Sequence, residues 1–338
     1  MIPYRTRRLV RNLLIAILVL VLVASAALIC WLLWLNRYIV YTRDGAKLDF
    51  SLSLQFPEGE LAQPPEPGET IEIYYNEGDN LITPESSELK PLSGIYITAE
   101  MLTQDLDAVQ KAARSIPADT AVMIDVKNIR GEFYYTTTNG RNSDKVDPGR
   151  MDILISTLKQ TNHYLIARVP ALRDYWFGLE NVDNGIFNPN RLSLWIDAER
   201  CYWLNPKAEG TVSYLIAIIT ELKSKGFDEV VFTDYCLPPT DNIYFPDDKV
   251  AAINDSAADL VKICSTDTFA VSFANSSDTF TLPDGRSRLY LENIAAADAA
   301  SKAQQTGLED PDIRLVFLTD LMDTRFDDYS VLRPMQLN

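Results

Sequence analysis

The sequence predicts an α/β domain of the TIM-barrel type, and two observations lead to this prediction. After residue 93, short apolar runs alternate with amphipathic stretches of helical period, which is the pattern of repeated βα units around a parallel sheet. Residues 93–338 number 246, close to the roughly 250 residues of a (β/α)₈ barrel. We therefore expect residues 93–338 to form one barrel-like domain.

Seven runs in this domain have the character of strands, one fewer than a complete barrel contains. They are Gly94–Glu100, Ala121–Lys127, His163–Val169, Glu229–Tyr235, Phe269–Asn275, Ser287–Asn293 and Arg314–Asp320. The 18 residues after Asp320 are too few for another full unit, so either the barrel is incomplete or an earlier run such as Ile71–Tyr75 supplies the missing strand. A doubly wound open sheet is the alternative, although no glycine-rich phosphate loop follows the first strand.

Between these runs, apolar residues repeat at helical period. The three stripes are Leu102, Leu106, Val109 and Ala113; Met151, Leu154, Ile155 and Leu158; and Val212, Leu215, Ile216, Ile219 and Leu222. We interpret the stripes as helix faces packed on the core.

An uncharged run, Leu13–Leu35, predicts a transmembrane helix, because its 23 residues span the roughly 30 Å hydrocarbon core of a bilayer. Residues 1–12 contain four arginines and no acid, which places them in the cytoplasm and the C-terminal domain outside the cell. A cleaved signal peptide is the alternative, since Val23–Ala27 offers small residues. The apolar run nevertheless continues to Leu35, beyond the roughly 7–15 residues of a signal peptide.

Residues 36–92 are expected to form an extracellular stalk. The segment Phe56–Thr70 is rich in proline and glutamate, a composition that stays extended and builds no core. Two runs of alternating character, Ala46–Leu54 and Ile71–Tyr75, are the exceptions, and they have the pattern of short strands.

The chain is acidic, with a formal net charge of −16, and the part beyond the four N-terminal arginines carries −20. Nucleic acid is not expected as a partner, because binding it normally requires a basic patch. The lipid bilayer is the expected partner of the apolar run. Cys201, Cys236 and Cys264 have no metal-site spacing, and a bridge between Cys201 and Cys236 is one pairing that the sequence allows.

Histidine content narrows the chemistry further. His163 is the single histidine, which excludes multi-histidine metal sites, and its place at the start of a strand favours a structural role. We expect neither a metal nor a cofactor.

Acidic residues stand near the ends of several predicted strands, at the rim where barrels carry their active sites. They are Glu100, Asp125, Asp234, Glu292 and Asp320. A pair of carboxylates suffices for glycoside hydrolysis, because one protonates the leaving oxygen and the other attacks or activates water. We expect a catalytic site around Asp125, with Asp234 or Glu292 as its partner. For each acid the alternative is that it caps the following helix.

Several segments, in this order, resemble a known family. They are GIYITAE at Gly94, VMIDVKNIRG at Val122, YLIARVPALRD at Tyr164, WLNP at Trp203 and GFDEVVFTDYCLPP at Gly226. Together they are similar to a family of bacterial domains described as putative glycoside hydrolases with a TIM-barrel fold, over Gly94–Pro239. The resemblance implies a barrel domain that acts on polysaccharide.

The resemblance also implies site residues. It places a family acid on Asp125, an arginine on Arg168 and a later acid on Asp174, and we expect the last two to bind substrate. In the fourth strand the family aspartate falls on Thr233. Because a shift of one residue turns a strand side chain to the other face, Asp234 replaces that acid only if a bulge intervenes. Pairing of Arg168 with Asp125, to neutralise both charges, is an equal alternative.

Aromatic residues follow Asp174 in one long loop. We expect Tyr175, Trp176 and Trp203 to stack on sugar rings in a substrate groove, and packing within the loop is the alternative. The sequence thus predicts a membrane-anchored extracellular barrel that hydrolyses polysaccharide or cell-wall glycan. Two other hypotheses remain: a catalytically inactive barrel that binds envelope glycan or a partner protein, and a structural envelope protein.

Overall fold

The computed structural model describes residues 39–42, 45–48 and 88–337, and the chain divides into two compact units, Met1–Asp79 and Asn80–Asn338. In the first unit, β1 (Ile39–Thr42) and β2 (Gly45–Leu48) form an antiparallel pair. The predicted tail 1–12, the predicted transmembrane run Leu13–Leu35 and the run Ile71–Tyr75 lie outside the described residues. Within the described ranges, no helix has the length and apolar character needed to cross a membrane.

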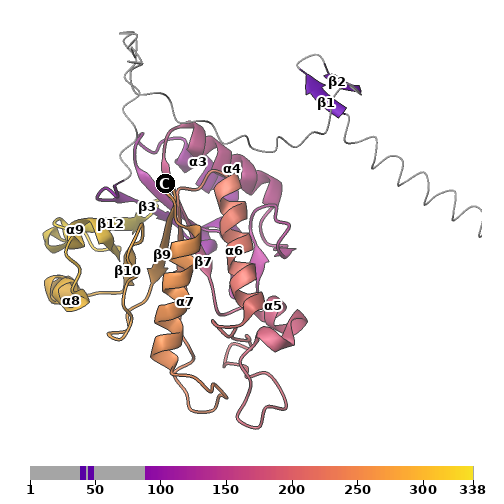
Figure 1. Cartoon of the computed structure of the whole chain (residues 1–338). Helices are drawn as coiled ribbons and strands as arrows, with labels where there is room; N and C mark the ends of the chain where they lie inside the picture. The colour runs from indigo at the N-terminus through magenta and orange to yellow at the C-terminus, as the bar shows by residue number, and fades with distance from the viewer. Residues whose placement is uncertain (1–38, 43–44, 49–87, 338) are drawn as a thin grey trace, which may run out of the picture. The chain divides into compact units, whose positions relative to one another are not determined.

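The second unit contains a closed barrel of eight parallel strands, which confirms the predicted TIM-like architecture (Figure 1). The strands are β3 (Ser93–Ile97), β4 (Ala121–Asp125), β7 (Tyr164–Pro170), β8 (Glu229–Thr233), β9 (Ala270–Ala274), β10 (Leu289–Glu292), β11 (Leu315–Leu318) and β12 (Ser330–Pro334). Each barrel strand pairs with its neighbours in chain order, and β12 pairs with β3 to close the ring. The open doubly wound sheet is thereby excluded.

The eighth strand corrects the sequence analysis. We expected the residues after Asp320 to be too few for another unit, but β12 lies among them. A short 3₁₀ turn, Thr324–Phe326, replaces the usual crossover helix, and its Phe326 ring packs 5.2 Å from the ring of Phe317. The barrel therefore closes without any contribution from Ile71–Tyr75.

Helices surround the barrel, mostly in the crossovers between strands (Figure 1). They are α2 (Ala99–Gln104), α3 (Leu106–Ala113), α4 (Pro148–Gln160), α5 (Tyr175–Glu180), α6 (Glu209–Ser224), α7 (Lys249–Cys264), α8 (Ala299–Thr306) and α9 (Pro311–Arg314). The stripe that begins at Leu102 spans two helices, because Asp105 leaves the helical region and its carboxylate caps α3 by accepting from the Ala108 N–H at 2.9 Å. A small parallel pair, β5 (Glu132–Phe133) and β6 (Arg141–Asn142), lies in the loop after β4.

The core has two layers, as alternating strand side chains require. Outward-facing strand residues and the helix stripes form the larger cluster, and inward-facing residues such as Met123, Ile166 and Val231 fill the barrel. Near the amino-terminal end of the strands, the buried pair Arg288 and Glu229 joins two strands, with an N–O distance of 2.5 Å.

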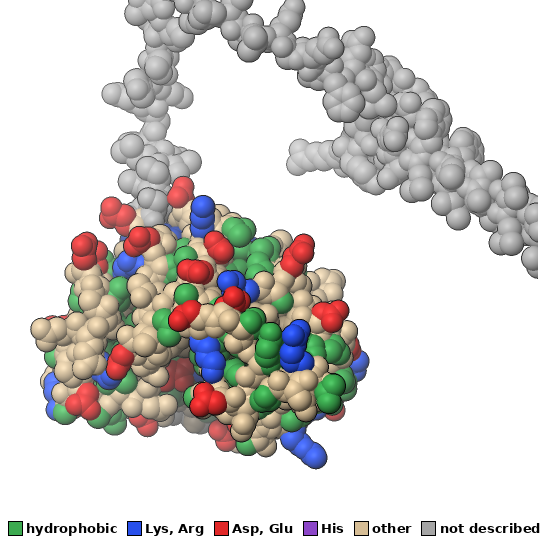
Figure 2. Space-filling model, turned by 60° about the horizontal axis from the view of Figure 1, so that its bottom comes forward, with side chains coloured by type: hydrophobic (Ala, Val, Ile, Leu, Met, Phe, Trp, Pro, Cys, Tyr) green, Lys and Arg blue, Asp and Glu red, His purple; other side chains and the backbone are tan. Residues whose placement is uncertain are grey.

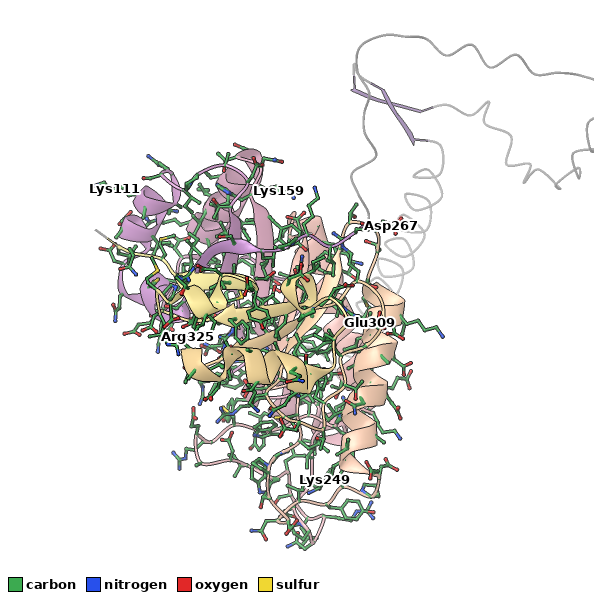
Figure 3. All side chains as sticks on the ribbon, turned by 90° about the vertical axis from the view of Figure 1, so that its left-hand side faces the viewer. Lys111, Lys159, Lys249, Asp267, Glu309 and Arg325 are labelled. Atoms are coloured by element: carbon green, nitrogen blue, oxygen red, sulfur yellow. The ribbon has the colours of Figure 1, made fainter. Side chains whose placement is uncertain are left out.

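The last residues of the predicted stalk belong to the barrel. Leu92 is 8% exposed and packs inside the barrel, and the Arg288 guanidinium donates to the Lys90 carbonyl at 2.7 Å. Figure 3 separates the two ends of the barrel: Lys249, at the start of α7, lies at one end, and Lys159 and Asp267 lie at the other. The strands end on the side of Lys249.

Candidate active site

Asp125, the last residue of β4, lies inside the mouth of the barrel and is 7% exposed. The Tyr96 hydroxyl lies 2.8 Å from each of its carboxylate oxygens, and the Ala99 N–H at the start of α2 donates to Oδ2 at 2.7 Å. Arg168 donates to Oδ1 at 3.0 Å. Asp125 does not cap the helix that follows its strand, since α2 precedes β4, but the alternative pairing with Arg168 is present.

Arg168, on β7, joins Asp125 to a second acid. Its Nη2 and Nε donate to Oε1 of Glu292, at the end of β10, at 2.7 and 3.2 Å. The structure thus brings together Asp125, Arg168 and Glu292, three of the predicted site residues. Burial lowers the pKa of Arg168, whereas the nearby Tyr96, Asp125 and Glu292 raise it. The net shift is upward, so the guanidinium stays charged.

Asp234 follows β8 directly, and its backbone leaves the strand. Its φ is +49°, a left-handed conformation that Asp tolerates better than most residues. We expected a bulge to be necessary if Asp234 were to serve the site, whereas β8 pairs with β7 in continuous register to Thr233 and the backbone departs from strand geometry only at Asp234 itself. Because Asp234 directly follows the carboxyl end of β8, it lies at the mouth of the barrel.

The electrostatic state of Asp234 differs from that of a surface acid. Burial raises its pKa above the usual range, although the positive charges of Arg173 and Arg168 oppose the shift. No hydrogen bond or ion pair joins its carboxylate to another described residue. Asn293, immediately after Glu292, also has a positive φ, of +58°. Both strand ends thus carry the local backbone strain that often marks functional sites.

Asp174, which we expected to bind substrate, is buried and paired within the protein. It is fully buried, and its carboxylate pairs with the buried Lys127 ammonium at 2.8 Å and accepts from the Tyr214 hydroxyl at 2.9 Å. It also caps α5 by accepting from the Phe177 N–H at 2.8 Å. All of its contacts hold the loop after β7 to the barrel, so its role is structural.

The predicted aromatic groove is only partly present. Trp203 is 7% exposed, its indole N–H donates to Asp197 at 3.0 Å, and it packs with Ile186 and Ile243 in a small cluster that joins the loops after β7 and β8. This result corrects its assignment to substrate binding. Packing explains the burial, because an indole with a buried hydrogen-bond partner gains more inside than at the surface.

Tyr175 and Trp176 are half-buried and keep part of their surface in solvent. Tyr175 stacks on Tyr202, with centroids 5.5 Å apart, and the Arg130 guanidinium lies 4.2 Å from its centroid. The Arg141 guanidinium lies 3.9 Å from the Trp176 ring. Both rings thus already have partners on at least one side.

Sequence reasoning missed two residues of the site, Tyr96 and Arg173. Tyr96 points into the barrel between Asp125 and Arg168, and alternation along β3 from the buried Ile97 was the available signal. Arg173 pairs with Asp197 at 2.6 Å and lies near Asp234. No local pattern marks Arg173, because its partner is distant in the sequence.

The remaining acidic candidates form no hydrogen bond or ion pair with Asp125, Arg168 or Glu292. Glu100 is exposed on α2, where it accepts from Gln104, and Asp320 is exposed beyond β11. His163 is 3% exposed, with its Nδ1 3.1 Å from the Thr120 carbonyl oxygen at the opposite end of the barrel, as expected for a structural residue. Cys201 and Cys236 are free thiols, so the bridge that the sequence allowed does not form.

Residues 94–266 match the family model described as "Putative glycosyl hydrolase domain". The chain belongs to this family. The matched segment runs from β3 through α7, so it contains Asp125, Arg168 and Asp234 and excludes Glu292. A comparison with curated proteins gave no match.

Comparison with solved structures found similar chains of low sequence identity. The α-galactosidase from Lactobacillus brevis is 11% identical, with a TM-score of 0.50, over 74% of this chain and 38% of that protein. The chain thus spans well under half of that enzyme's length. The glycoside hydrolase domain of PelA from Pseudomonas aeruginosa is 12% identical, with a TM-score of 0.46, over 72% and 95% of the two chains. A hypothetical protein from Ruminiclostridium thermocellum ATCC 27405 is 23% identical, with a TM-score of 0.45, over 53% and 96%.

Proposed function

We propose that this protein hydrolyses glycosidic bonds, with Asp234 as the general acid and Glu292 as the second catalytic carboxylate. One observation carries the proposal: two acids from separate strand ends meet at the barrel mouth, one of them with a raised pKa and the other held by an arginine. Glycoside hydrolysis needs a protonated carboxyl beside an ionised one, and different surroundings of two acids produce this difference.

Asp234 has the properties of the proton donor. Its raised pKa favours the protonated carboxyl more than in a surface acid, and no described residue forms a hydrogen bond with its oxygens. In the reaction its proton passes to the glycosidic oxygen as the bond to the anomeric carbon breaks, which leaves the Asp234 carboxylate.

Glu292 suits the second role. Arg168 holds Oε1, and among the described residues Oε2 has no hydrogen-bond partner, so this oxygen is available to attack the anomeric carbon or to take a proton from water. Asp125 is a positioning residue in this scheme. Both of its oxygens already accept bonds from Tyr96, Arg168 and the Ala99 amide, which leaves it to fix the orientation of Arg168.

The proposed substrate is polysaccharide or cell-wall glycan, and the proposed location of the barrel is outside the cell, tethered by the run Leu13–Leu35. The arginine-rich N-terminus and the strongly acidic remainder of the chain support this orientation. The aromatic residues Tyr175 and Trp176, half-buried in the loop after β7, remain candidates for contact with the glycan.

The test measures release of reducing sugar from a panel of polysaccharides and peptidoglycan. Residues Asn80–Asn338 form a compact unit with a closed barrel and its own core, and this fragment is compared with Asp234→Asn and Glu292→Gln. Asp320→Asn is the matched control, because Asp320 is also an acid beyond a strand end but is exposed and forms no bond with the proposed site residues. Turnover by the wild type and the control that is lost in both variants supports the proposal.

A non-catalytic glycan-binding barrel is the second candidate. The ion pairs of Arg168 with Asp125 and Glu292 favour it, since they neutralise charges that an enzyme would use. In that case the folded fragment binds a glycan of the panel without turnover, and Glu292→Gln leaves the binding unchanged.

A further inference from the structure

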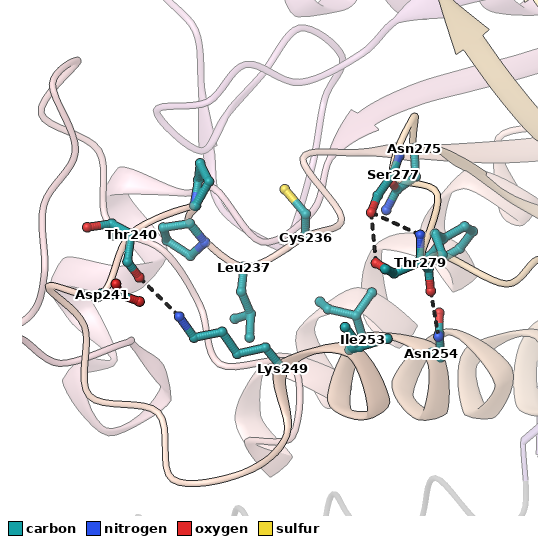
Figure 4. A pocket seen from close by; sticks show the side chains of 14 residues that line it. Cys236, Leu237, Thr240, Asp241, Lys249, Ile253, Asn254, Asn275, Ser277 and Thr279 are labelled. Carbon is teal, nitrogen blue, oxygen red and sulfur yellow. Dashed lines mark hydrogen bonds between the residues drawn. The ribbon is translucent and has the colours of Figure 1, made fainter.

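A pocket of about 380 Å³ opens beside the candidate site, between the loops that follow β8 and β9 (Figure 4). We call it the β8–β9 pocket. Its lining begins at Cys236, two residues after Asp234, and includes Asn275, the first residue after β9. It therefore lies at the same end of the barrel as the proposed catalytic acids, and its volume falls in the roughly 300–1,000 Å³ range of ligand pockets.

Hydrogen bonds fix the walls of this pocket and join them to Asp234. The Asn275 amide donates to the carbonyl of Tyr235, the residue after Asp234, at 3.0 Å. The Tyr235 hydroxyl donates to Ser256 on α7 at 2.9 Å, and Asn254 on the same helix donates to the Thr279 carbonyl at 3.1 Å. The pocket is thus a preformed cavity, and a hydrogen bond joins its wall to the residue that follows Asp234.

The chemistry of the lining combines apolar surface with short polar groups. Figure 4 shows Leu237 and Ile253 between two polar walls, with Thr240 and Lys249 on one side and Thr279 on the other. Phe280 adds an aromatic ring. Sugar rings have this mixed character, because hydroxyl groups surround faces of C–H bonds.

The charge and polarity of the lining argue against anionic ligands and lipid tails. Of the residues that line the pocket, only Asp241 and Lys249 carry charge, and their charges cancel. A phosphate or carboxylate ligand would require an excess of basic groups, and a lipid tail would require a lining without hydroxyl and amide groups. Figure 2, with this end of the molecule turned forward, shows acidic and basic side chains intermingled across the face.

We propose that the β8–β9 pocket is a sugar-binding subsite that holds a unit of the substrate glycan next to the bond cleaved at Asp234. This inference rests on the proposed function and deepens it. It makes the substrate a chain of several sugar units that runs across the acids into the pocket. Such contacts beyond the reacting unit help to lower the barrier, because binding energy from remote parts of a substrate orients its reacting bond.

Cys236 gives a direct measure of pocket occupancy. Its thiol lines the pocket, and burial together with the nearby Asp234 charge raises its pKa to about 11, so it reacts slowly but measurably at alkaline pH. Cys201 and Cys264 are buried. The full-length chain in detergent micelles is treated with methyl methanethiosulfonate, and peptide mapping by mass spectrometry follows Cys236 alone.

The probes are β-1,4-linked oligomers of N-acetylglucosamine and of glucose, from two to six units. Oligomers of at least one series should slow the labelling of Cys236 by about tenfold at a concentration near ten times Kd, with protection increasing with length. If no oligomer of either series protects Cys236, the assignment is overturned.

Two variants fill the pocket from opposite walls, Val250→Trp on α7 and Thr279→Trp on the β9 loop. Both should abolish protection, and circular dichroism confirms that they fold. Ile263→Trp is the matched control, because Ile263 is exposed on the same helix and lies outside the pocket. Equal protection in the filled variants and in the control would overturn the proposal.

Hydrolysis of the same oligomers separates this inference from the proposed function. Protection of Cys236 without hydrolysis supports the subsite and contradicts the proposed hydrolase activity. Hydrolysis without protection of Cys236 supports the proposed hydrolase activity and overturns the subsite assignment. Hydrolysis together with protection, both reduced about tenfold or more for long oligomers in Val250→Trp, supports both.

Discussion

Arg168 and Glu292 form an ion pair across the barrel mouth, with an N–O distance of 2.7 Å, although 124 positions separate them in the chain. The same guanidinium bonds Asp125 at 3.0 Å. One arginine therefore fixes two of the three acids at the mouth relative to each other, and the third, Asp234, stays free of such a partner among the described residues.

Replacement of Arg168 should destabilise the barrel as well as the site. Arg168→Met leaves Asp125 and Glu292 facing each other without a cation, and we expect the free energy of unfolding to fall by roughly 3 kcal/mol. Urea denaturation of the fragment 80–338 measures this. Arg325→Met removes the exposed pair with Asp323 and should have a much smaller effect, because solvent screens exposed ion pairs. Equal losses in the two variants would contradict the bridging role of Arg168.

The raised pKa of Asp234 predicts a stability that depends on pH. Because its pKa is higher in the folded than in the unfolded chain, its contribution is fully present below the unfolded value, near pH 4, and is lost as pH rises through the folded value. Asp234→Asn removes the ionisation, so the variant should be more stable than the wild type at pH 7 and should lose this advantage near pH 4.

The same shift predicts the alkaline limb of the activity profile. As a general acid, Asp234 must be protonated, so kcat should fall as pH rises through its pKa in the substrate complex. Asp234→Asn should have low activity at every pH and no alkaline limb attributable to this residue. A wild-type limb that persists unchanged in the residual activity of the variant would assign it to another group.

The pair of Lys127 and Asp174 should matter for stability and little for substrate affinity. Asp174→Asn leaves the fully buried Lys127 ammonium without its counter-charge, and we expect a loss of about 3–5 kcal/mol in the free energy of unfolding. Thermal unfolding gives the loss, and if the proposed hydrolysis is observed, the KM of the folded variant should stay within a few-fold of wild type. A stable Asp174→Asn variant with a greatly raised KM would restore Asp174 to substrate binding.

Gly94 allows the first two barrel strands, β3 and β4, to approach each other closely. A Cβ built at this position lies 2.0 Å from the Ala121 carbonyl oxygen, so Gly94→Ala forces β3 and β4 apart and should destabilise by roughly 1–3 kcal/mol. Thermal unfolding measures the effect. At Gly307 the added Cβ meets no atom within 4 Å, so Gly307→Ala carries only the cost of a left-handed φ of +65°. A smaller loss for Gly94→Ala than for Gly307→Ala would contradict the packing argument.

Much of the fold and part of the site could be predicted from the sequence. The apolar runs and stripes mark the strands and the main helices because burial is periodic along each element. Asp125 and Glu292 could be identified because acids at strand ends meet at one rim. The burial of Asp174 and Trp203 could not be predicted, because an exposed and a buried paired side chain of the same type look alike in a sequence.

The sequence by itself determined the acidic character of the chain, the uncharged run Leu13–Leu35 and the order of βα units, because each depends on local composition or spacing. The tertiary structure alone decided that β12 closes the barrel, that Arg168 joins Asp125 to Glu292, and that Asp174 is buried against Lys127. These outcomes depend on which distant side chains share a low-dielectric interior. There an unpaired charge is costly, so partners are selected by geometry rather than by position in the chain.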